Sequence, residues 1–275
     1  MYFVLWHNRE LLWTLVKRDL KVRYKASVLG FFWSFCKPLL LTLVLLAVFS
    51  NVPRFELQAP RLPFVLHLLA GVLAWSFFSG SVHEGMFSIL SNADLVKKVK
   101  LPVETLPAAS VCSNLIHFLL AQCVLLFFCI VFGVPPTGWI VLAPIPILLL
   151  TALALSVASL TAALNVFYRD VVSIMEIVMQ AWFYGTPIFY ALYHARGVLL
   201  DRLGPWAYWL FVSNPLTPIV LAYRRCILAG ALEPRETPDG HLLVLLALAC
   251  VVIFIVHLIS VAVFRRLRPR FADEL

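Results

Sequence analysis

Six long apolar segments constrain this 275-residue chain more than any other feature of its sequence. A helix needs about 20 apolar residues to cross the hydrocarbon core of a bilayer, and each segment reaches that length. Only 13% of the residues are charged, whereas a soluble domain carries roughly 25%. We therefore predict an all-α membrane protein, a single transmembrane domain over residues 1–275. The predicted spans are 32–52, 63–82, 107–133, 139–164, 173–192 and 242–264.

The placement of Lys and Arg predicts the orientation of these spans. If the N-terminus is cytoplasmic, the cytoplasmic regions hold roughly twice as many Lys and Arg residues as the external regions. This excess is the usual sign of orientation in a membrane, so both termini are predicted to be cytoplasmic. The same basic residues cluster at the ends of apolar segments, which argues against nucleic acid as the reason for the net charge of +8.

The segment 8–28 is predicted to be an amphipathic helix that lies in the membrane interface. Lys17, Lys21 and Lys25 recur at every fourth residue, and apolar side chains such as Leu12 occupy the opposite side. The basic face suits anionic lipid headgroups, and the apolar face suits the acyl-chain boundary.

The stretch 204–223 is apolar and aromatic, but Asn214, Pro215 and Pro218 interrupt it near the middle. Each half is too short to span, and a seventh crossing would place the basic C-terminal residues outside. We therefore favour a re-entrant pair of short helices, with its turn at these three residues, over a full crossing. Broken backbone is tolerated at membrane depth where it packs against protein or lines a cavity.

The sequence contains no recognisable catalytic constellation. It lacks the Gly-rich phosphate loop that ends in Gly-Lys-Ser/Thr, so it cannot bind ATP in that way. His67, His117 and His257 fall in predicted spans without metal-ligand spacing, and we expect them to be packing residues. The predicted spans carry almost no carboxylate apart from Glu176, although a proton-driven carrier usually needs one. We predict no catalytic site, no metal site and no cofactor for this chain.

Four blocks of the sequence occur in the order and position found in one membrane family. They are Arg18–Lys25 with Pro38-Leu39, Asn92–Pro102 with Glu104 and Leu106-Pro107, Tyr168–Val171 with Phe183–Tyr190, and Asn214–Leu216 with Tyr223-Arg224. Together these blocks resemble the type-2 ABC exporter permeases of the polysaccharide and polyol-phosphate branch. Permeases of this branch export O-antigen, capsule, S-layer glycan or teichoic acid.

The resemblance implies a permease of the bacterial inner membrane that exports an O-antigen-like, lipid-diphosphate-linked glycan. It implies two copies of this chain and two copies of a separate ABC ATPase, which would bind ATP and Mg. A teichoic-acid, drug or small-lipid exporter of the same superfamily is the first alternative. A membrane-embedded acyl- or glycosyltransferase is the second, but the sequence shows no cluster of acidic residues or His of the kind such an enzyme needs.

The resemblance also implies roles for two segments. Segment 92–104 would be the coupling helix that docks on the ATPase, and 8–28 would be the gate helix. Alternatively, Lys97, Lys98 and Lys100 serve only to fix the orientation of the chain in the membrane. The coupling candidates are Asp94, Lys97, Lys98, Lys100, Pro102 and Glu104. The gate-helix candidates are Arg18, Asp19, Lys21, Arg23, Tyr24 and Lys25.

Aromatic side chains on the first and fifth spans are candidates for the channel lining, because these spans line the pathway in the family. Sugar C–H faces stack on aromatic rings, so such a lining would hold a glycan loosely and let it slide. The alternative is the belt of Trp and Tyr at membrane interfaces, which we favour for Trp75, Trp139 and Trp206. The lining candidates are Phe35, Trp182, Phe183, Tyr184, Phe189 and Tyr190.

Overall fold

The computed structural model describes residues 2–24, 33–49, 64–99, 101–134, 136–202, 204–228 and 239–275. Within these ranges the chain is helical and contains no strand. In chain order the helices are α1 (Tyr2–His7), α2 (Arg9–Tyr24), α3 (Trp33–Phe49), α4 (Phe64–Phe87), η3 (Leu90–Asn92), α5 (Ala93–Lys98), α6 (Thr105–Val131), η4 (Gly138–Leu142), α7 (Pro144–Asn165), α8 (Asp170–Tyr184), α9 (Leu192–Arg202), α10 (Pro205–Val212), α11 (Leu216–Leu228), α12 (Asp239–Leu267), η5 (Arg268–Arg270) and α13 (Phe271–Glu274).

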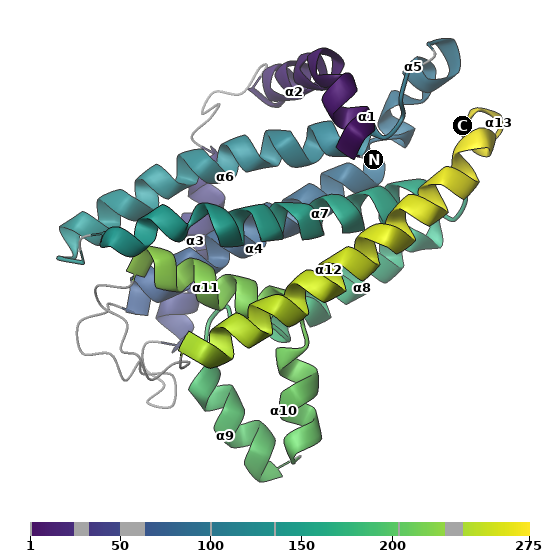
Figure 1. The fold of residues 1–275 in the computed structure, drawn as a ribbon. Helices are drawn as coiled ribbons and strands as arrows, with labels where there is room; N and C mark the ends of the chain where they lie inside the picture. The colour runs from purple at the N-terminus through teal and green to yellow at the C-terminus, as the bar shows by residue number, and fades with distance from the viewer. Residues whose placement is uncertain are drawn as a thin grey trace.

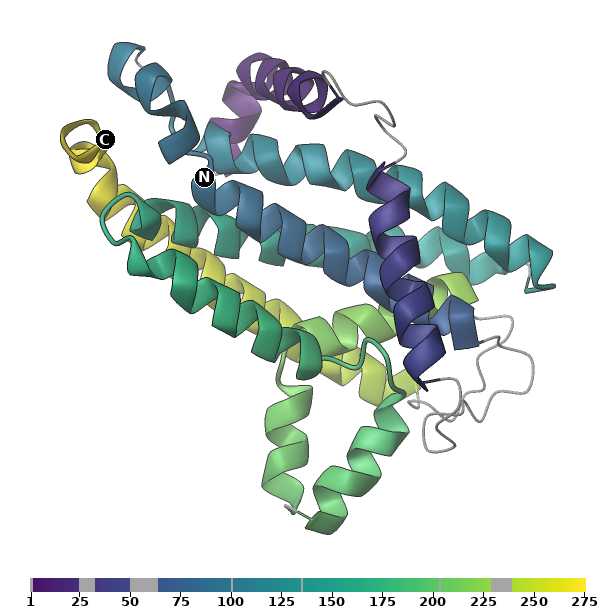
Figure 2. The same ribbon diagram turned by 180° about the vertical axis from the view of Figure 1, so that it is seen from behind.

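Helix α4 is the centre of the bundle. It packs against α6 and α7 along most of its length, and α12 packs on α7 (Figures 1 and 2). Small residues permit this close approach, as they commonly do between helices in lipid. A Cβ atom at Gly85 would lie 2.6 Å from the Cβ of Ala158 on α7. Glycine is therefore the residue that fits at this crossing.

Four helical segments are long and apolar enough to cross a membrane, and they correspond to the second, third, fourth and sixth predicted spans. In α3, which covers most of the first predicted span, the apolar stretch is shorter and runs over Pro38–Val48. The four segments are Phe64–Phe87, Thr105–Val131, Gly138–Asn165 and His241–Arg270.

The helix in the fifth predicted span is shorter than its sequence indicated. We predicted a span over 173–192, but α8 has 15 residues and ends at Tyr184. At 1.5 Å per residue its length is about 22 Å, less than the roughly 30 Å of a bilayer core. The physical reason is the sequence Gly185-Thr186-Pro187: glycine favours helix ends, and proline cannot continue the hydrogen-bond ladder.

The chain leaves the bundle after α8 and then returns to it. Helices α9 and α10 form a hairpin that projects from the bundle, and α11 packs against α4, α7 and α12 (Figures 1 and 2). The interruption predicted at Asn214 and Pro215 is present, because it separates α10 from α11. The second of these helices continues to Leu228, beyond the predicted limit of the segment at residue 223.

Both ends of the described chain lie at the same end of the bundle, together with α2 and α5 (Figure 1). We call this region, formed by residues 2–24, 93–98 and 268–275, the terminal end. Helix α2 packs against α6, and α13 contacts α5. Segments far apart in the sequence therefore meet here.

Candidate functional site

The predicted coupling segment forms a projection at the terminal end. No residue of α5 is buried, and Lys97 and Lys98 point their charges into solvent. The Asp94 carboxylate lies 3.6 Å from the Lys98 ammonium one helical turn away. Exposed pairs of this kind contribute little to stability. Lys100 lies outside the described residues. This helix therefore presents its charged side chains to solvent, while Leu95 and Val96 pack toward the bundle.

Glu104 differs from the other coupling candidates because it is buried. Its Oε1 accepts a hydrogen bond from Arg268 Nη1 at 2.9 Å, and the residue is only 7% exposed. The neighbouring Pro102 carbonyl accepts a hydrogen bond from the Thr105 hydroxyl at 2.7 Å, which ties the segment to the first residue of α6. Glu104 and Pro102 thus fix the base of the coupling segment and join it to the C-terminal residues.

The C-terminal helix closes against this base. Phe271 is 1% exposed, and its ring packs edge-on against Phe264 with a centroid distance of 5.4 Å. A cavity of about 660 Å³ remains between α5 and the C-terminal segment. Lys97, Lys98 and Arg268 are among the residues that line it. The terminal end therefore carries a basic groove beside the exposed face of α5.

Helix α2 has the two faces that its sequence predicted. Leu15 and Val16 are buried, whereas Lys17 and Lys21 are exposed. On the surface of the same helix, Arg18 donates to the carboxylate of its neighbour Asp19 at 2.9 Å. The side chain of Tyr24 and the whole of Lys25 lie outside the described residues.

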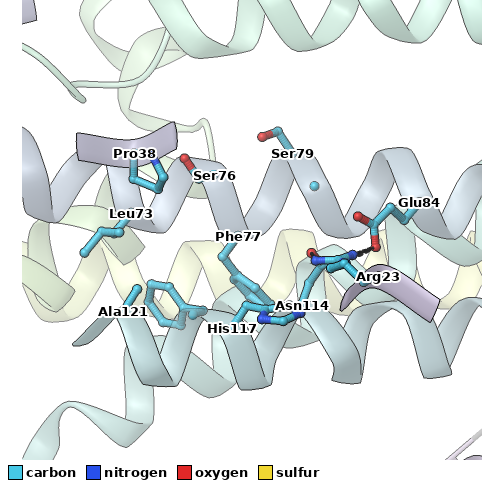
Figure 3. A pocket seen from close by; sticks show the side chains of 12 residues that line it. Arg23, Pro38, Leu73, Ser76, Phe77, Ser79, Glu84, Asn114, His117 and Ala121 are labelled. Atoms are coloured by element: carbon cyan, nitrogen blue, oxygen red, sulfur yellow. Dashed lines mark hydrogen bonds and ion pairs between the residues drawn. The ribbon is translucent and has the colours of Figure 1, made fainter. Parts of the chain in front are cut away.

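Arg23 connects the end of α2 to the centre of the bundle. Its guanidinium forms an ion pair with Glu84 on α4 and donates to Asn114 Oδ1 on α6 at 3.4 Å. The Asn114 amide donates to Glu84 Oε2 at 2.7 Å and to the Ser110 carbonyl at 3.0 Å. Figure 3 shows these side chains converging at one end of a cavity of about 310 Å³.

Sequence reasoning missed Glu84 and Asn114. We named Glu176 as the main carboxylate of the spans, because the second span was predicted to end at residue 82. Helix α4 continues to Phe87, so Glu84 lies within it. An acidic residue in the last turns of a long apolar helix was the available signal, since such a group needs a partner in lipid.

Asn214 holds the break between α10 and α11 against the end of α8. Trp182 Nε1 donates to Asn214 Oδ1 at 2.7 Å, and the Leu216 backbone N–H donates to the same oxygen at 3.1 Å. The Asn214 amide donates to the Gly185 carbonyl at 3.0 Å and to the Thr186 hydroxyl at 2.9 Å. Pro215 and Pro218 are buried beside this turn. Asn214 is therefore the hub of the turn that the sequence predicted.

Arg224 donates hydrogen bonds to two backbone carbonyls of the segment that follows α8. It is fully buried, and its guanidinium donates to the Pro187 carbonyl at 2.6 Å and to the Ile188 carbonyl. Gly71 on α4 makes room for it, because a Cβ there would lie 2.2 Å from Arg224 Nη2. Arg224 thus has an internal, structural role.

The aromatic lining candidates that follow residue 181 form one cluster, but their side chains differ in exposure. Tyr184 is exposed, and its carbonyl accepts a hydrogen bond from the Tyr190 hydroxyl at 2.8 Å. Phe189 is buried. Phe183 packs against Trp75 at a centroid distance of 5.4 Å, so Trp75 belongs to this cluster. The side chain of Phe35 lies outside the described residues.

The fold is that of a polytopic membrane protein, because long apolar helices surround α4. Its two polar features are the basic groove at the terminal end and the cavity beneath α2. Among the residues that the structure describes, no group of His, Cys, Asp and Glu could hold a metal ion. The family profile described as ABC-2 type transporter matches residues 10–228. The chain belongs to this family. It is a multi-pass inner-membrane transporter subunit, and its ATPase is a separate ABC protein.

Relatives similar over nearly the whole chain are known from two bacteria. The chain is 32% identical to the O-antigen export system permease protein RfbA of Myxococcus xanthus, over 98% of this chain and 97% of that protein. It is 29% identical to a protein of the same name from Klebsiella pneumoniae, over 97% of this chain and 95% of that protein.

We expect Asn214→Asp to destabilise the protein. The substitution keeps the shape but replaces an amide donor by an oxygen that faces the Gly185 carbonyl. Losing a buried hydrogen bond and leaving its acceptor unpaired costs about 1–3 kcal/mol, which thermal unfolding in detergent should report as a lower Tm. Ser213→Ala, at the exposed neighbouring position, is the matched control and should unfold like the wild type. Equal Tm values for Asn214→Asp and the wild type would show that Asn214 is not a structural hub.

Proposed function

We propose that this chain is the permease subunit of an ATP-driven exporter of an O-antigen-like, lipid-linked surface polysaccharide. The observation that carries the proposal is the similarity, over nearly the whole chain, to two permeases named for O-antigen export. In the proposed complex two copies of this chain work with two ABC ATPase subunits, which bind ATP and Mg. The lipid-diphosphate-linked glycan crosses the bacterial inner membrane between the two permease copies.

Deleting the chain from its bacterial host tests this function directly. We expect surface polysaccharide to be lost while the lipid-linked glycan accumulates inside the cell, because synthesis continues without export. Extraction of lipid-linked sugars and electrophoresis of surface polysaccharide measure the two pools, and a plasmid copy of the chain should restore both. Unchanged surface polysaccharide, or loss of a teichoic-acid-like polymer instead, would contradict the proposal.

The proposed topology has six spans with both termini in the cytoplasm. The spans are α3, α4, α6, α7, α8 and α12, and the segment from α9 to α11 lies on the external side, with α10 and α11 as the re-entrant pair. Two observations support this arrangement: the chain ends share the terminal end of the bundle, and Lys and Arg residues cluster on the segments assigned to the cytoplasm.

Thiol labelling tests this topology. Single cysteines at Gly204 and His241, in a background without the native cysteines, should both react with a membrane-impermeant reagent from outside. A cysteine at Lys98 should react only after the membrane is opened, since α5 would lie in the cytoplasm. If Gly204 reacts from outside but His241 only from inside, the segment between them crosses the membrane and the six-span topology is wrong.

The exposed surface of α8 supports a homodimer. None of the residues of α8 is buried, and the exposed positions include the polar side chains of Ser173, Glu176 and Gln180. Polar groups of this kind are costly against lipid and usually face protein or water. A second copy of the chain would cover this helix and enclose a hydrated path between α3 and α8 of the two copies.

Disulfide crosslinking tests the dimer. A cysteine at Val44 on α3 and another at Ile177 on α8, carried by separately tagged copies, should form a covalent dimer under mild oxidation in membranes. Leu258 on α12 is about as exposed as Val44 but is not part of the interface proposed between α3 and α8, so a cysteine there paired with one at Ile177 should give little crosslink. Equal yields from both pairs would indicate random collision instead of the proposed interface.

The exposed lysines of α5 are proposed to dock on the ATPase. Replacing Lys97 and Lys98 together with Glu should abolish co-purification with the ATPase and the vanadate-sensitive ATP hydrolysis of the complex, because the docking charge is reversed. Arg265→Glu with Arg266→Glu is the matched control, since it changes the charge of the same end by the same amount. If both double variants behave alike, the lysines act only as topology signals.

A further inference from the structure

The polar cavity beneath α2 lies apart from the ATPase-docking surface proposed for α5, so its lining residues need an explanation of their own. Its volume is about 310 Å³, at the lower end of the roughly 300–1,000 Å³ of small-molecule sites. It follows α4 from Glu84 to Ser76, a distance of about 12 Å at 1.5 Å per residue. It therefore begins at the end of α2 and reaches well into the bundle. Figure 3 shows the residues that line it.

The described residues of the cavity wall offer many hydrogen-bonding groups and little net charge. Neutral polar side chains come from Ser76, Ser79 and Asn114, and His117 adds an imidazole ring. Among the lining residues that the structure describes, Arg23 and Glu84 carry full charges, and these two form an ion pair with each other. A multiply charged anion would have to displace Glu84 before it could reach the guanidinium. A neutral ligand with several hydroxyl groups could instead bond both partners without breaking the pair.

The remaining wall is apolar and aromatic. Phe77 and Phe118 lie side by side with ring centroids 5.0 Å apart, and both contribute to the lining together with Leu73 and Pro38. A sugar ring has hydroxyl groups around its edge and C–H groups on its faces. Hydroxyls suit the carboxylate, amide and serine groups, and the C–H faces suit the phenyl rings.

We propose that the cavity formed by α2, α3, α4 and α6 is a carbohydrate subsite for the sugar nearest the lipid carrier. This proposal rests on the proposed export of a lipid-linked glycan and adds the place where its first sugar is bound. The volume limits the occupant to a small group such as a single sugar residue. The diphosphate of the carrier would remain at the interface beside the basic face of α2, while the lipid tail stays in the bilayer.

Binding to the permease–ATPase complex in nanodiscs, without ATP, tests the subsite. The probes are a polyprenyl diphosphate that carries one hexose and the same polyprenyl diphosphate without sugar, and native mass spectrometry measures both Kd values. We expect the sugar-bearing lipid to bind about ten-fold more tightly, the effect of one or two net hydrogen bonds. Ser76→Leu with Ser79→Leu fills the cavity and should remove this preference, while the Kd of the sugarless lipid stays unchanged.

Two further variants keep the test decisive. Cys123→Leu, on the exposed surface of α6, is the matched control and should keep the preference. Glu84→Gln, nearly isosteric, covers the case in which the double Ser variant fails to fold; it should weaken the preference for sugar and release Arg23. Equal binding of the two lipids by the wild type overturns the subsite, as does tighter binding of both by Glu84→Gln, which would mark a phosphate site.

Failure of the subsite and failure of the export function give different results. If deletion of the chain abolishes surface polysaccharide but the wild-type complex shows no preference for the sugar-bearing lipid, only the subsite is wrong. If deletion leaves surface polysaccharide unchanged, the export function is wrong, whatever the nanodisc measurement gives.

Discussion

A backbone carbonyl that leaves a helix inside a bilayer must find a donor within the protein, because lipid offers none. The end of α8 is where this requirement shapes the chain most strongly. Arg224 donates to the carbonyls of Pro187 and Ile188, and Asn214 donates to the carbonyl of Gly185. Both donors come from α11 or from the turn before it, so they fix α11 against α8. Since α11 also packs on α4, α7 and α12, two polar side chains join the segment after α8 to the bundle.

At the terminal end, ion pairs fasten the two ends of the chain to the central helices. Arg23 pairs with Glu84 of α4, and Arg268 pairs with Glu104 at the start of α6. Each pair joins segments that the sequence separates widely, and each lies where an exposed basic surface meets the apolar bundle. In each pair a carboxylate neutralises the arginine that faces the bundle, while the other basic side chains of the terminal end remain exposed. Apolar packing of Phe271 adds a second attachment for the C-terminal helix.

Hydropathy was sufficient to predict the long helices, because about 20 apolar residues leave a chain few choices in lipid. The helix break at Asn214-Pro215 was equally predictable, since proline removes a donor wherever it stands. The polar pairs were not predictable, because nothing local in the sequence brings Arg23 to Glu84 or buries Arg224. The short α8 is a different case: Gly185 and Pro187 are a local signal for its end, but the prediction followed the apolar run, which continues past Tyr184.

The two attachments at the terminal end differ in strength, and this difference bears on how the proposed exporter works. The side chains of Arg23 and Glu84 are 31% and 40% exposed, and pairs of this kind typically contribute about 1 kcal/mol or less. Phe271 is buried, and burial of a Phe side chain contributes about 1.5–3 kcal/mol, to which the pair with the buried Glu104 is added. We infer that the end of α2 separates from α4 more easily than the C-terminal helix separates from the base of α5. In the proposed exporter, the cavity beneath α2 would then open to a ligand while the groove beside α5, the proposed docking surface, keeps its shape.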